Sequence, residues 1–353
     1  MAPASGDAAL RAVVFDTTCR FEPDRPRPEP RPGECLIRVH QAGICATDLN
    51  ITKGYMNFTG VVGHEFVGTV EAGSPTWRGK RIACEINCVC RTCDMCHAGL
   101  ANHCRTRTVM GIAGRDGCMA DYVAMPEANL HAVPDAVPDE EAVFIEPLAA
   151  AYQVLLQCQI ERRMTVSVIG AGRLGLLVAS VLAPTACRLT VIGRTQAKLD
   201  LCEKRGIQAV DVRAFVPTQD RDVVVDCTGS PGGLELAMKT VRPRGTIVLK
   251  STYASPARAA AHRAGGASSP DIPHSEPAVL PDAGIDLSPL VVNEVKLLGS
   301  RCGPFRDAIN ALARRAVDVR PLISKVFPIE QASAAFAAAA DRRNVKVLLK
   351  MHG

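Results

Sequence analysis

The chain has 353 residues, of which 47% are hydrophobic and 22% are charged, and these values indicate a globular protein with two domains or one domain with a large insertion. Its formal net charge of +5 is mixed along the chain, and no block of like charges predicts a nucleic-acid or membrane surface. The N-terminal segment lacks the apolar core of a signal peptide, and no apolar run is long enough to cross a bilayer. The 15 cysteines favour a reducing compartment, the cytoplasm, in which some of the thiols bind metal.

Three short motifs in the first part of the chain hold candidate metal ligands. Cys45 lies in GICATD, His64 and Glu65 lie in GVVGHEFVG, and Glu146 lies in VFIEPLAAAYQV. A lone cysteine or histidine is more often a packed core residue, but glycines on both sides of His64 let the backbone crowd a site. Glu146 stands in an apolar run, where a buried charge is costly unless a cation is near. One thiolate, one imidazole and one carboxylate leave a fourth position open, as in a catalytic zinc site.

Between these motifs, the stretch CVCRTCDMCHAGLANHC holds five cysteines. Four of them follow one another at spacings suited to a tetrahedral zinc site, and they are Cys90, Cys93, Cys96 and Cys104. Four thiolates leave no position for water or substrate, so we expect this zinc to hold a loop together without taking part in chemistry. Cys88 is the spare thiol, and the alternative interpretation is that all five are free buried cysteines.

The segment RMTVSVIGAGRLGLLVASVLA predicts a strand at 166–169, a tight turn and a helix that continues to Leu182. Its turn matches the pattern G-x-G-x-x-G, in which glycines permit close approach of a pyrophosphate and close packing of helix on strand. The position of the motif between a strand and a helix makes it a strong indication of dinucleotide binding. The predicted contacts are Gly170, Gly172, Arg173, Leu174 and Gly175.

The next predicted strand, RLTVIGRT, ends without the acidic residue that holds the ribose hydroxyls in NAD-binding sites. Its end carries Gly193, Arg194 and Thr195, and Lys198 follows one turn later. A guanidinium and a hydroxyl can bind a 2′-phosphate, and we expect the glycine to leave room for it. The sequence therefore favours NADP over NAD. In the alternative interpretation, Arg194 stacks on adenine and accepts either cofactor.

Further strands and helices alternate through DVVVDCTGS, GGLELAMKTV, GTIVLKSTY and VKLLGSRCG, which predicts a parallel, doubly wound α/β sheet. Ligands bind at the carboxyl ends of such strands. The residues that this rule nominates as cofactor neighbours are Thr228, Gly229, Ser251, Thr252, Ser300, Arg301 and Cys302. The segment 254–284 is rich in Ala, Pro, Ser and Gly, so we expect it to be a disordered surface insert. The alternative interpretation is a lid or an arm at a subunit interface.

The order of these segments resembles the zinc-dependent medium-chain dehydrogenase/reductase superfamily over nearly the whole chain. The resemblance implies a β-rich, GroES-like catalytic domain at 1–150 and 303–353, with the zinc lobe at 88–104, and a Rossmann cofactor domain at 151–302. It also implies hydride transfer between NADP(H) or NAD(H) and an alcohol or polyol, or its aldehyde or ketone. Two zinc ions per chain, a small-molecule substrate and a homodimer or homotetramer are the corresponding expectations.

The resemblance also assigns roles around the open metal set. Cys45 and His64 match the catalytic zinc ligands, and Glu146, in the sequence EPL, matches the third ligand of the polyol and sugar dehydrogenase branch. Glu65 matches an acid beside the metal that can exchange with water. The four cysteines of the 88–104 lobe match the structural zinc site.

The proton path is implied by the same resemblance. Thr47 matches the hydroxyl that relays the substrate proton, and Asp48 matches the carboxylate that orients the zinc-binding histidine. Many relatives end this path in a histidine, but Asn50 stands at that position here and cannot act as a general base. We therefore expect the proton to leave through the cofactor ribose and water, or through another group.

Two alternatives from other functional classes remain open. A non-enzymatic zinc-binding module would use the four-cysteine lobe to bind nucleic acid, but no aromatic residue lies between Cys88 and Cys104. A zinc-independent reductase of activated double bonds would share the fold and would leave Cys45, His64 and Glu146 without a role. The number of bound zinc ions distinguishes these alternatives.

Overall fold

The computed structural model describes residues 10–252 and 285–352, and the predicted insert at 254–284 lies outside the described residues. The chain divides into two compact units. The first consists of Met1–Gln153 with Cys302–Gly353, and the second of Val154–Arg301. No helix in the described parts of the chain is long and apolar enough to span a membrane.

The first unit is built mainly from strands. They are β1 (Leu10–Phe15), β2 (Cys19–Arg25), β3 (Glu34–Ile44), β4 (Gly60–Val61), β5 (Glu65–Ala72), β6 (Arg81–Cys84), β7 (Asn87–Cys88), β8 (Thr108–Met110), β9 (Gly114–Arg115), β10 (Tyr122–Pro126), β11 (Leu130–Ala132), β18 (Ile323–Pro328) and β19 (Lys346–Lys350). Its helices are α1 (Ala46–Ile51), α2 (Asp94–His97), α3 (Asp139–Ala142), α4 (Ile145–Gln157, which continues into the second unit), α10 (Phe305–Ala313) and α11 (Ala332–Ala340).

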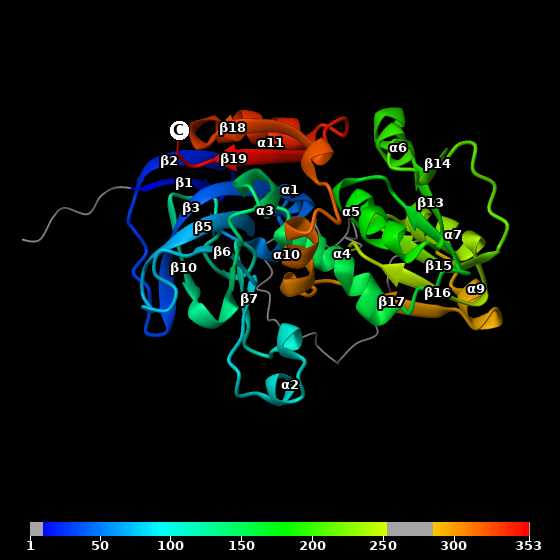
Figure 1. The fold of residues 1–353 in the computed structure, drawn as a ribbon, viewed down its shortest axis with the longest axis horizontal. Helices are drawn as coiled ribbons and strands as arrows, with labels where there is room; N and C mark the ends of the chain where they lie inside the picture. The colour runs from blue at the N-terminus through cyan, green and yellow to red at the C-terminus, as the bar shows by residue number, and fades with distance from the viewer. Residues whose placement is uncertain (1–9, 253–284, 353) are drawn as a thin grey trace, which may run out of the picture. The chain divides into compact units, whose positions relative to one another are not determined.

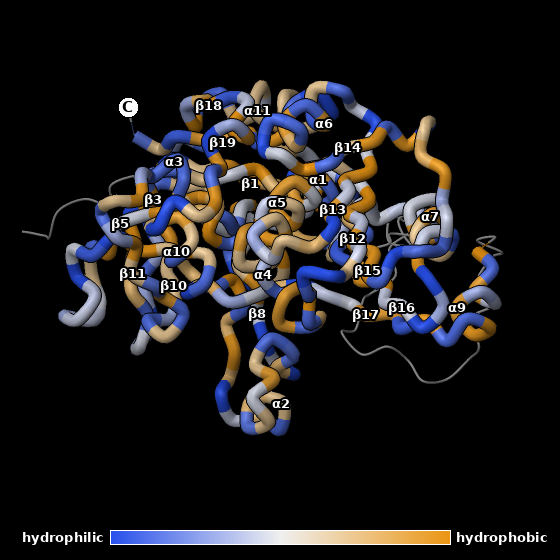
Figure 2. Tube along the Cα trace, turned by 45° about the vertical axis from the view of Figure 1, so that its right-hand side comes forward, coloured by the Kyte–Doolittle hydropathy of each residue, from blue (hydrophilic) through white to orange (hydrophobic). Residues whose placement is uncertain are grey.

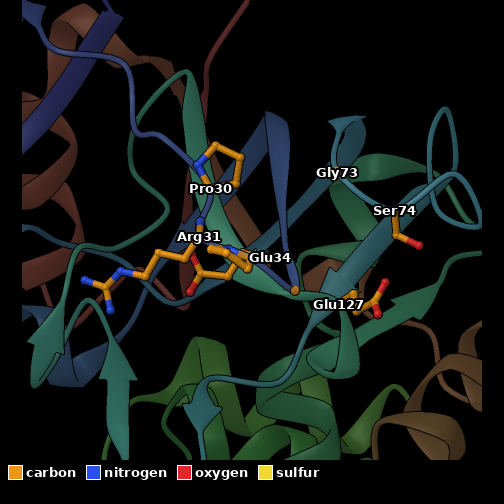
Figure 3. A pocket seen from close by; sticks show the side chains of 8 residues that line it. Pro30, Arg31, Glu34, Gly73, Ser74 and Glu127 are labelled. Atoms are coloured by element: carbon orange, nitrogen blue, oxygen red, sulfur yellow. The ribbon is translucent and has the colours of Figure 1, made fainter.

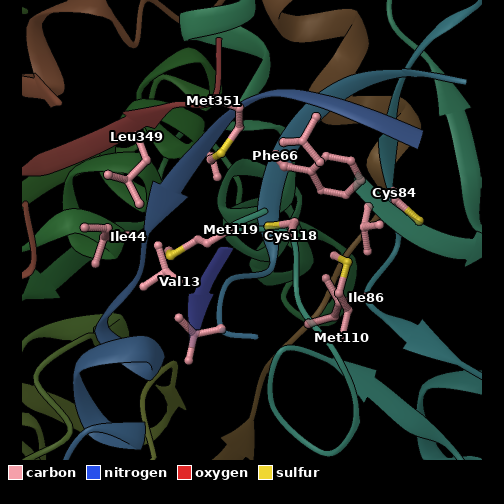
Figure 4. Close-up of a cluster of buried hydrophobic side chains, with 14 of the residues drawn as sticks. Val13, Ile44, Phe66, Cys84, Ile86, Met110, Cys118, Met119, Leu349 and Met351 are labelled. Carbon is pink, nitrogen blue, oxygen red and sulfur yellow. The ribbon is translucent and has the colours of Figure 1, made fainter. Parts of the chain in front are cut away.

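A seven-stranded sheet forms the centre of this unit, in the order β11-β6-β5-β3-β19-β18 with β10 also paired to β3. Because β19 pairs antiparallel with β3, the C-terminal segment completes a sheet that the N-terminal segment begins, as the red and blue strands of Figure 1 show. Two three-stranded sheets, β2-β1-β4 and β7-β8-β9, flank it. The core of the unit is apolar, and Figure 4 shows some of its members, among them Ile44, Phe66, Met119 and Leu349.

The second unit is a six-stranded sheet in which every neighbouring pair of strands is parallel. The order is β14-β13-β12-β15-β16-β17. Its elements are β12 (Thr165–Ile169), α5 (Arg173–Leu182), β13 (Arg188–Gly193), α6 (Gln196–Glu203), β14 (Gln208–Asp211), β15 (Arg221–Asp226), α7 (Pro231–Thr240), β16 (Val241–Leu249), α9 (Ser288–Val292) and β17 (Lys296–Gly299). The predicted α/β class, a β-rich unit with a doubly wound parallel sheet, is confirmed.

The strand order reverses at β12, which pairs with β13 on one side and β15 on the other. The residues of β12 are all buried, as expected for a strand covered on both faces, and α5 follows after the glycine turn. A Cβ on Gly175 would lie 1.9 Å from the carbonyl oxygen of Gly170, so only glycine allows this helix to pack so closely on the turn. The cofactor motif therefore lies at the topological switch point, where such sheets bind ligands.

Candidate active site

Strand pairing in the first unit brings three of the predicted metal-site residues together. Cys45 follows β3 and is the N-cap of α1, while His64 and Glu65 stand at the start of β5. Because β3 and β5 are antiparallel neighbours with Gly43 opposite Glu65, the end of one strand meets the start of the other. The candidate ligand atoms of Cys45, His64 and Glu65 all lie within 4.8 Å of one another.

Asp48 links two members of this group. Its Oδ2 accepts a hydrogen bond from the backbone N–H of Cys45 at 2.7 Å, and its Oδ1 lies 3.3 Å from Nδ1 of His64. Asp48 is 0% exposed and His64 is 3% exposed, so the pair is held away from water. Burial lowers the pKa of His64, but the charges of Asp48 and Cys45 outweigh it and leave that pKa well above its ordinary value.

These residues fit a zinc ion. His64 Nδ1 and Asp48 Oδ1 are buried and face each other, although neither has a well-aligned hydrogen bond. A histidine whose one ring nitrogen faces a carboxylate can use the other ring nitrogen to bind a metal. A thiol, an imidazole and a carboxylate are the donors that zinc accepts.

Two other predicted residues lie near this group. Thr47, in α1, has its Oγ1 3.8 Å from Sγ of Cys45, which is hydrogen-bonding range for sulfur. Glu146 lies in the first turn of α4 and is partly exposed. The carboxylate in the group of ligand atoms within 4.8 Å of one another is that of Glu65, and Glu146 is outside this group.

The four lobe cysteines form a second group. The sulfur atoms of Cys90, Cys93, Cys96 and Cys104 lie within 4.8 Å of one another, and Cys88 is not part of the group. Backbone N–H groups point at two of the sulfurs: that of Thr92 donates to Cys90 at 3.5 Å and that of Cys90 donates to Cys104 at 3.3 Å. Hydrogen bonds from Thr92 are the main cause that lowers the pKa of Cys90 to about 5. Burial raises the pKa of Cys96 to about 12, so ready ionisation does not extend to all four thiols. The convergence of four sulfur atoms is what suits a closed zinc site.

The predicted cofactor residues of the second unit gather at the carboxyl ends of its strands. Thr228 and Gly229 follow β15, Ser251 and Thr252 follow β16, and Ser300 follows β17. Buried Lys250 connects two of these ends, because its Nζ donates to Oγ of Ser300 at 3.1 Å and to the carbonyl of Arg301 at 2.9 Å. Cys302 belongs to the first unit, and its sulfur accepts a hydrogen bond from Asn87 at 3.2 Å.

The residues predicted to bind a 2′-phosphate lie at the end of β13 and the start of α6. Arg194 is exposed and Thr195 is the N-cap of α6, but Lys198 is buried at 8% exposure. A Cβ on Gly193 would lie 2.7 Å from Cβ of Ala171 and 2.9 Å from Cδ2 of Leu199. Packing against Ala171 and Leu199 explains why a glycine stands here, and its role in leaving room for a phosphate stays a prediction. The expected preference for NADP therefore rests on Arg194 and Thr195.

Glu65 has a buried ion-pair partner that the sequence motifs do not predict. Lys346, from β19, forms an ion pair with Glu65, and both side chains are almost completely buried, at 3% and 1% exposure. In the sequence, Lys346 is followed by the apolar run VLL. A charged residue in an apolar run is also the pattern that indicates Glu146.

The pocket of Figure 3 is separate from these groups. It is lined by the segment that leads into β3 and by residues that follow β5 and β10, and they are Pro30, Arg31, Pro32, Gly33, Glu34, Gly73, Ser74 and Glu127. None of them is a predicted site residue.

Comparisons with known proteins identify the family. Residues 31–135 match the alcohol dehydrogenase GroES-like domain. The chain is 30% identical to the starvation-sensing protein RspB of Escherichia coli K12 over 66% of this chain and 74% of that protein. It is 26% identical to a sorbitol dehydrogenase of Halalkalibacterium halodurans over 92% of this chain and 94% of that protein.

The chain belongs to the zinc-dependent medium-chain dehydrogenase/reductase superfamily. Its fold is shared by a solved structure described as a short chain alcohol dehydrogenase, rspB of Escherichia coli CFT073, in complex with NADH. The two chains superpose with a TM-score of 0.81 at 24% identity, and the match covers 98% of this chain and 100% of the rspB chain. The resemblance seen in the sequence is confirmed, and the chain is an NAD(P)-dependent oxidoreductase of the alcohol and polyol dehydrogenase type.

Proposed function

We propose that Cys45 and His64 bind a catalytic zinc ion and that this zinc supports the dehydrogenase activity of the chain. The observation that carries the proposal is the convergence of partly exposed Cys45 with buried His64 and Glu65, where Asp48 contacts both Cys45 and His64. When bound, zinc supplies Lewis acidity toward an alcohol or carbonyl oxygen, and NADP or NAD supplies or accepts the hydride.

Each residue of the group then has a defined task. Asp48 fixes the ring of His64 and the backbone of Cys45, so the two ligands keep one geometry. Thr47 carries the hydroxyl that passes the substrate proton toward water, since Asn50 cannot accept it. Glu146 and Glu65 are the two candidate carboxylates: Glu146 is proposed as the third ligand, and Glu65 as the one that exchanges with water.

The lobe is proposed to hold a second zinc, bound by Cys90, Cys93, Cys96 and Cys104, with a purely structural role. Metal analysis of the purified protein tests the two-zinc proposal. Two zinc ions per chain support it. One ion, confined to the lobe, supports a zinc-binding module, and none supports a zinc-independent reductase on the same fold.

The substrate class that we propose is an alcohol or polyol. The relative named sorbitol dehydrogenase, which spans nearly the same length, supports this class. A location in the cytoplasm is proposed from the 15 cysteines, none of which forms a disulfide in the structure.

NADP is proposed as the preferred cofactor. The exposed Arg194 guanidinium can donate paired hydrogen bonds to a 2′-phosphate, and hydrogen bonds to charged groups contribute about 1.5–3 kcal/mol. Arg194→Ala should therefore weaken NADP binding roughly tenfold or more, because about 1.4 kcal/mol corresponds to a factor of ten. Binding of NAD should change little.

Dissociation constants of both cofactors for wild type and Arg194→Ala, measured by fluorescence titration, decide the matter. Arg213→Ala is the matched control, since its guanidinium is already paired with Asp211. Equal losses of NADP and NAD affinity in Arg194→Ala would support adenine stacking and contradict the NADP proposal.

A homodimer or homotetramer is proposed from the edge of the second unit's sheet. Among the residues that the structure describes, β17 is the last strand of that sheet, and apolar side chains near it are exposed: Val291 and Val292 at 79% and Leu297 at 42%. Figure 2 shows α9, which carries the two valines, as an orange segment. An unpaired apolar edge is a surface that a second copy of the chain can cover.

Val292→Lys combined with Leu297→Lys should shift the protein toward monomer, because charges on this edge oppose its burial. Light scattering after size exclusion measures the mass. Val216→Lys, which changes a loop valine at 74% exposure, is the control and should leave the mass unchanged. A double variant with the wild-type oligomeric mass would contradict the role of the β17 edge.

A further inference from the structure

The carboxylate of Glu65 has a second partner besides the group formed with Cys45 and His64. Nζ of Lys346 contacts Oε2 of Glu65. The pair is sealed from solvent, with 3% of the lysine side chain and 1% of the glutamate side chain exposed. The same ammonium also lies over the ring of Phe144, 5.6 Å from its centroid. A buried ion pair of this kind is costly to break on one side only.

Three neighbouring strands fix this pair in place. Glu65 on β5 stands opposite Gly43 on β3, and β19, which carries Lys346, pairs with β3 on its other side. The two side chains therefore meet across β3 at Gly43. A Cβ on Gly43 would lie 2.7 Å from both Oε2 of Glu65 and Cε of Lys346, so the glycine makes the space in which the pair forms.

The position of the pair has a consequence for the metal site. A ligand atom of Glu65 is within 4.8 Å of those of Cys45 and His64, so the carboxylate lies within reach of an ion held by them. One carboxylate then has two cations to choose between: the fixed ammonium of Lys346 and the ion. The relative strength of these two interactions decides whether Glu65 fills the coordination position that a substrate oxygen needs.

We propose that Lys346 is a positioning residue that holds Glu65 as an exchangeable, rather than a permanent, ligand of the ion bound by Cys45 and His64. This inference rests on the proposed zinc site. The ammonium offers the carboxylate an alternative partner, so the carboxylate can leave the ion without becoming an unpaired buried charge. The open position stays available to substrate, as catalytic zinc sites require.

Removing the ammonium should lock the carboxylate onto the ion. In Lys346→Met, which has a similar length and no charge, the ion becomes the nearest cation for Glu65. We expect release of this ion to a chelator to slow by roughly tenfold or more, because a buried carboxylate without another partner is strongly disfavoured. With cobalt in place of zinc, the visible spectrum of this site should change toward higher coordination. The KM for alcohol should rise, because substrate competes with a fixed ligand.

The experiment compares cobalt spectra and chelator release rates for wild type, Lys346→Met, Lys346→Arg and Lys346→Met with Glu65→Gln. Lys346→Arg should restore wild-type behaviour in part, and adding Glu65→Gln should abolish the effect of Lys346→Met. Lys350→Met, which changes an exposed lysine on the same strand, is the matched control and should behave as wild type. If Lys346→Met does not fold, Lys346→Gln, which can still donate a hydrogen bond to Glu65, is expected to shift both readouts in the same direction.

Cys45→Ser separates the two proposals. If Cys45→Ser keeps the full cobalt content and spectrum, the proposed metal site itself fails. If Cys45→Ser loses this cobalt signal but the neutral Lys346 variants keep wild-type spectra and release rates, the metal site stands and the role of Lys346 is overturned. A lower melting temperature with unchanged spectrum and release rate would likewise reduce Lys346 to a structural residue.

Discussion

Cys45→Ser should remove one of the two proposed zinc ions and reduce turnover by at least about 1,000-fold, while the protein keeps its fold. Lewis-acid stabilisation by a metal is worth several kcal/mol, and about 4 kcal/mol corresponds to a factor of about 1,000. The fold should survive because Cys45 caps a short helix at the edge of the core, and the sheet pairing of β3 does not depend on its sulfur.

Zinc content by elemental analysis, turnover and the circular dichroism spectrum should be measured together on this variant. Cys35→Ser is the matched control, because Cys35 is a fully buried thiol on β3 outside both ligand groups. The control should lose some stability and keep its zinc. A Cys45→Ser variant with unchanged zinc content, or with near wild-type turnover, would contradict the catalytic assignment.

Cys93→Ser should have the opposite signature, with a large loss of stability in the lobe. Zinc bound by four thiolates contributes directly to folding, with apparent values of about 10–16 kcal/mol in zinc-finger peptides. Apolar packing of the lobe's helix adds little, because α2 spans only Asp94–His97 and contains no buried residue, and the Arg105–Asp94 ion pair is exposed. We expect faster proteolysis and faster hydrogen exchange between Cys90 and Cys104.

Limited proteolysis and hydrogen exchange locate the change, and metal analysis counts the ions. The control is Cys88→Ser, a change at the first residue of the lobe in a cysteine outside the four-sulfur group. It should retain both ions and a protected lobe. A Cys93→Ser variant whose lobe stays protected would show that the four cysteines hold no structural metal.

Much of the fold could be predicted because local patterns were sufficient. The glycine turn between an apolar strand and an apolar helix predicted the dinucleotide fold, and the helix ends at Leu182 as expected. Alternating strands and helices then predicted the parallel sheet. The lobe cysteines were grouped by spacing alone, because all four lie within one short loop segment.

What the sequence did not reveal depends on contacts between distant segments. Lys346 meets Glu65 only because β19 pairs with β3, and no local pattern reports a pairing between residues so far apart. Gly193 stands where an NAD-binding site carries a carboxylate, and the prediction was based on that absence. In the structure, close packing against Ala171 and Leu199 explains the glycine. Glu146 was chosen because it stood in an apolar run. The same reasoning would have singled out Lys346 as a charged residue in an apolar run, but it would not have revealed Glu65 as its partner.

The most direct measurement is hydride transfer itself, followed at the nicotinamide absorbance with a panel of alcohols and polyols, each with NADP and with NAD. We predict turnover of at least one secondary alcohol or polyol by the wild type, faster at low cofactor concentration with NADP, and loss of that turnover in Cys45→Ser. Turnover of the same substrate by Cys45→Ser at the wild-type rate, or activity confined to activated double bonds, would contradict the assignment of Cys45, His64 and their carboxylates to a catalytic zinc.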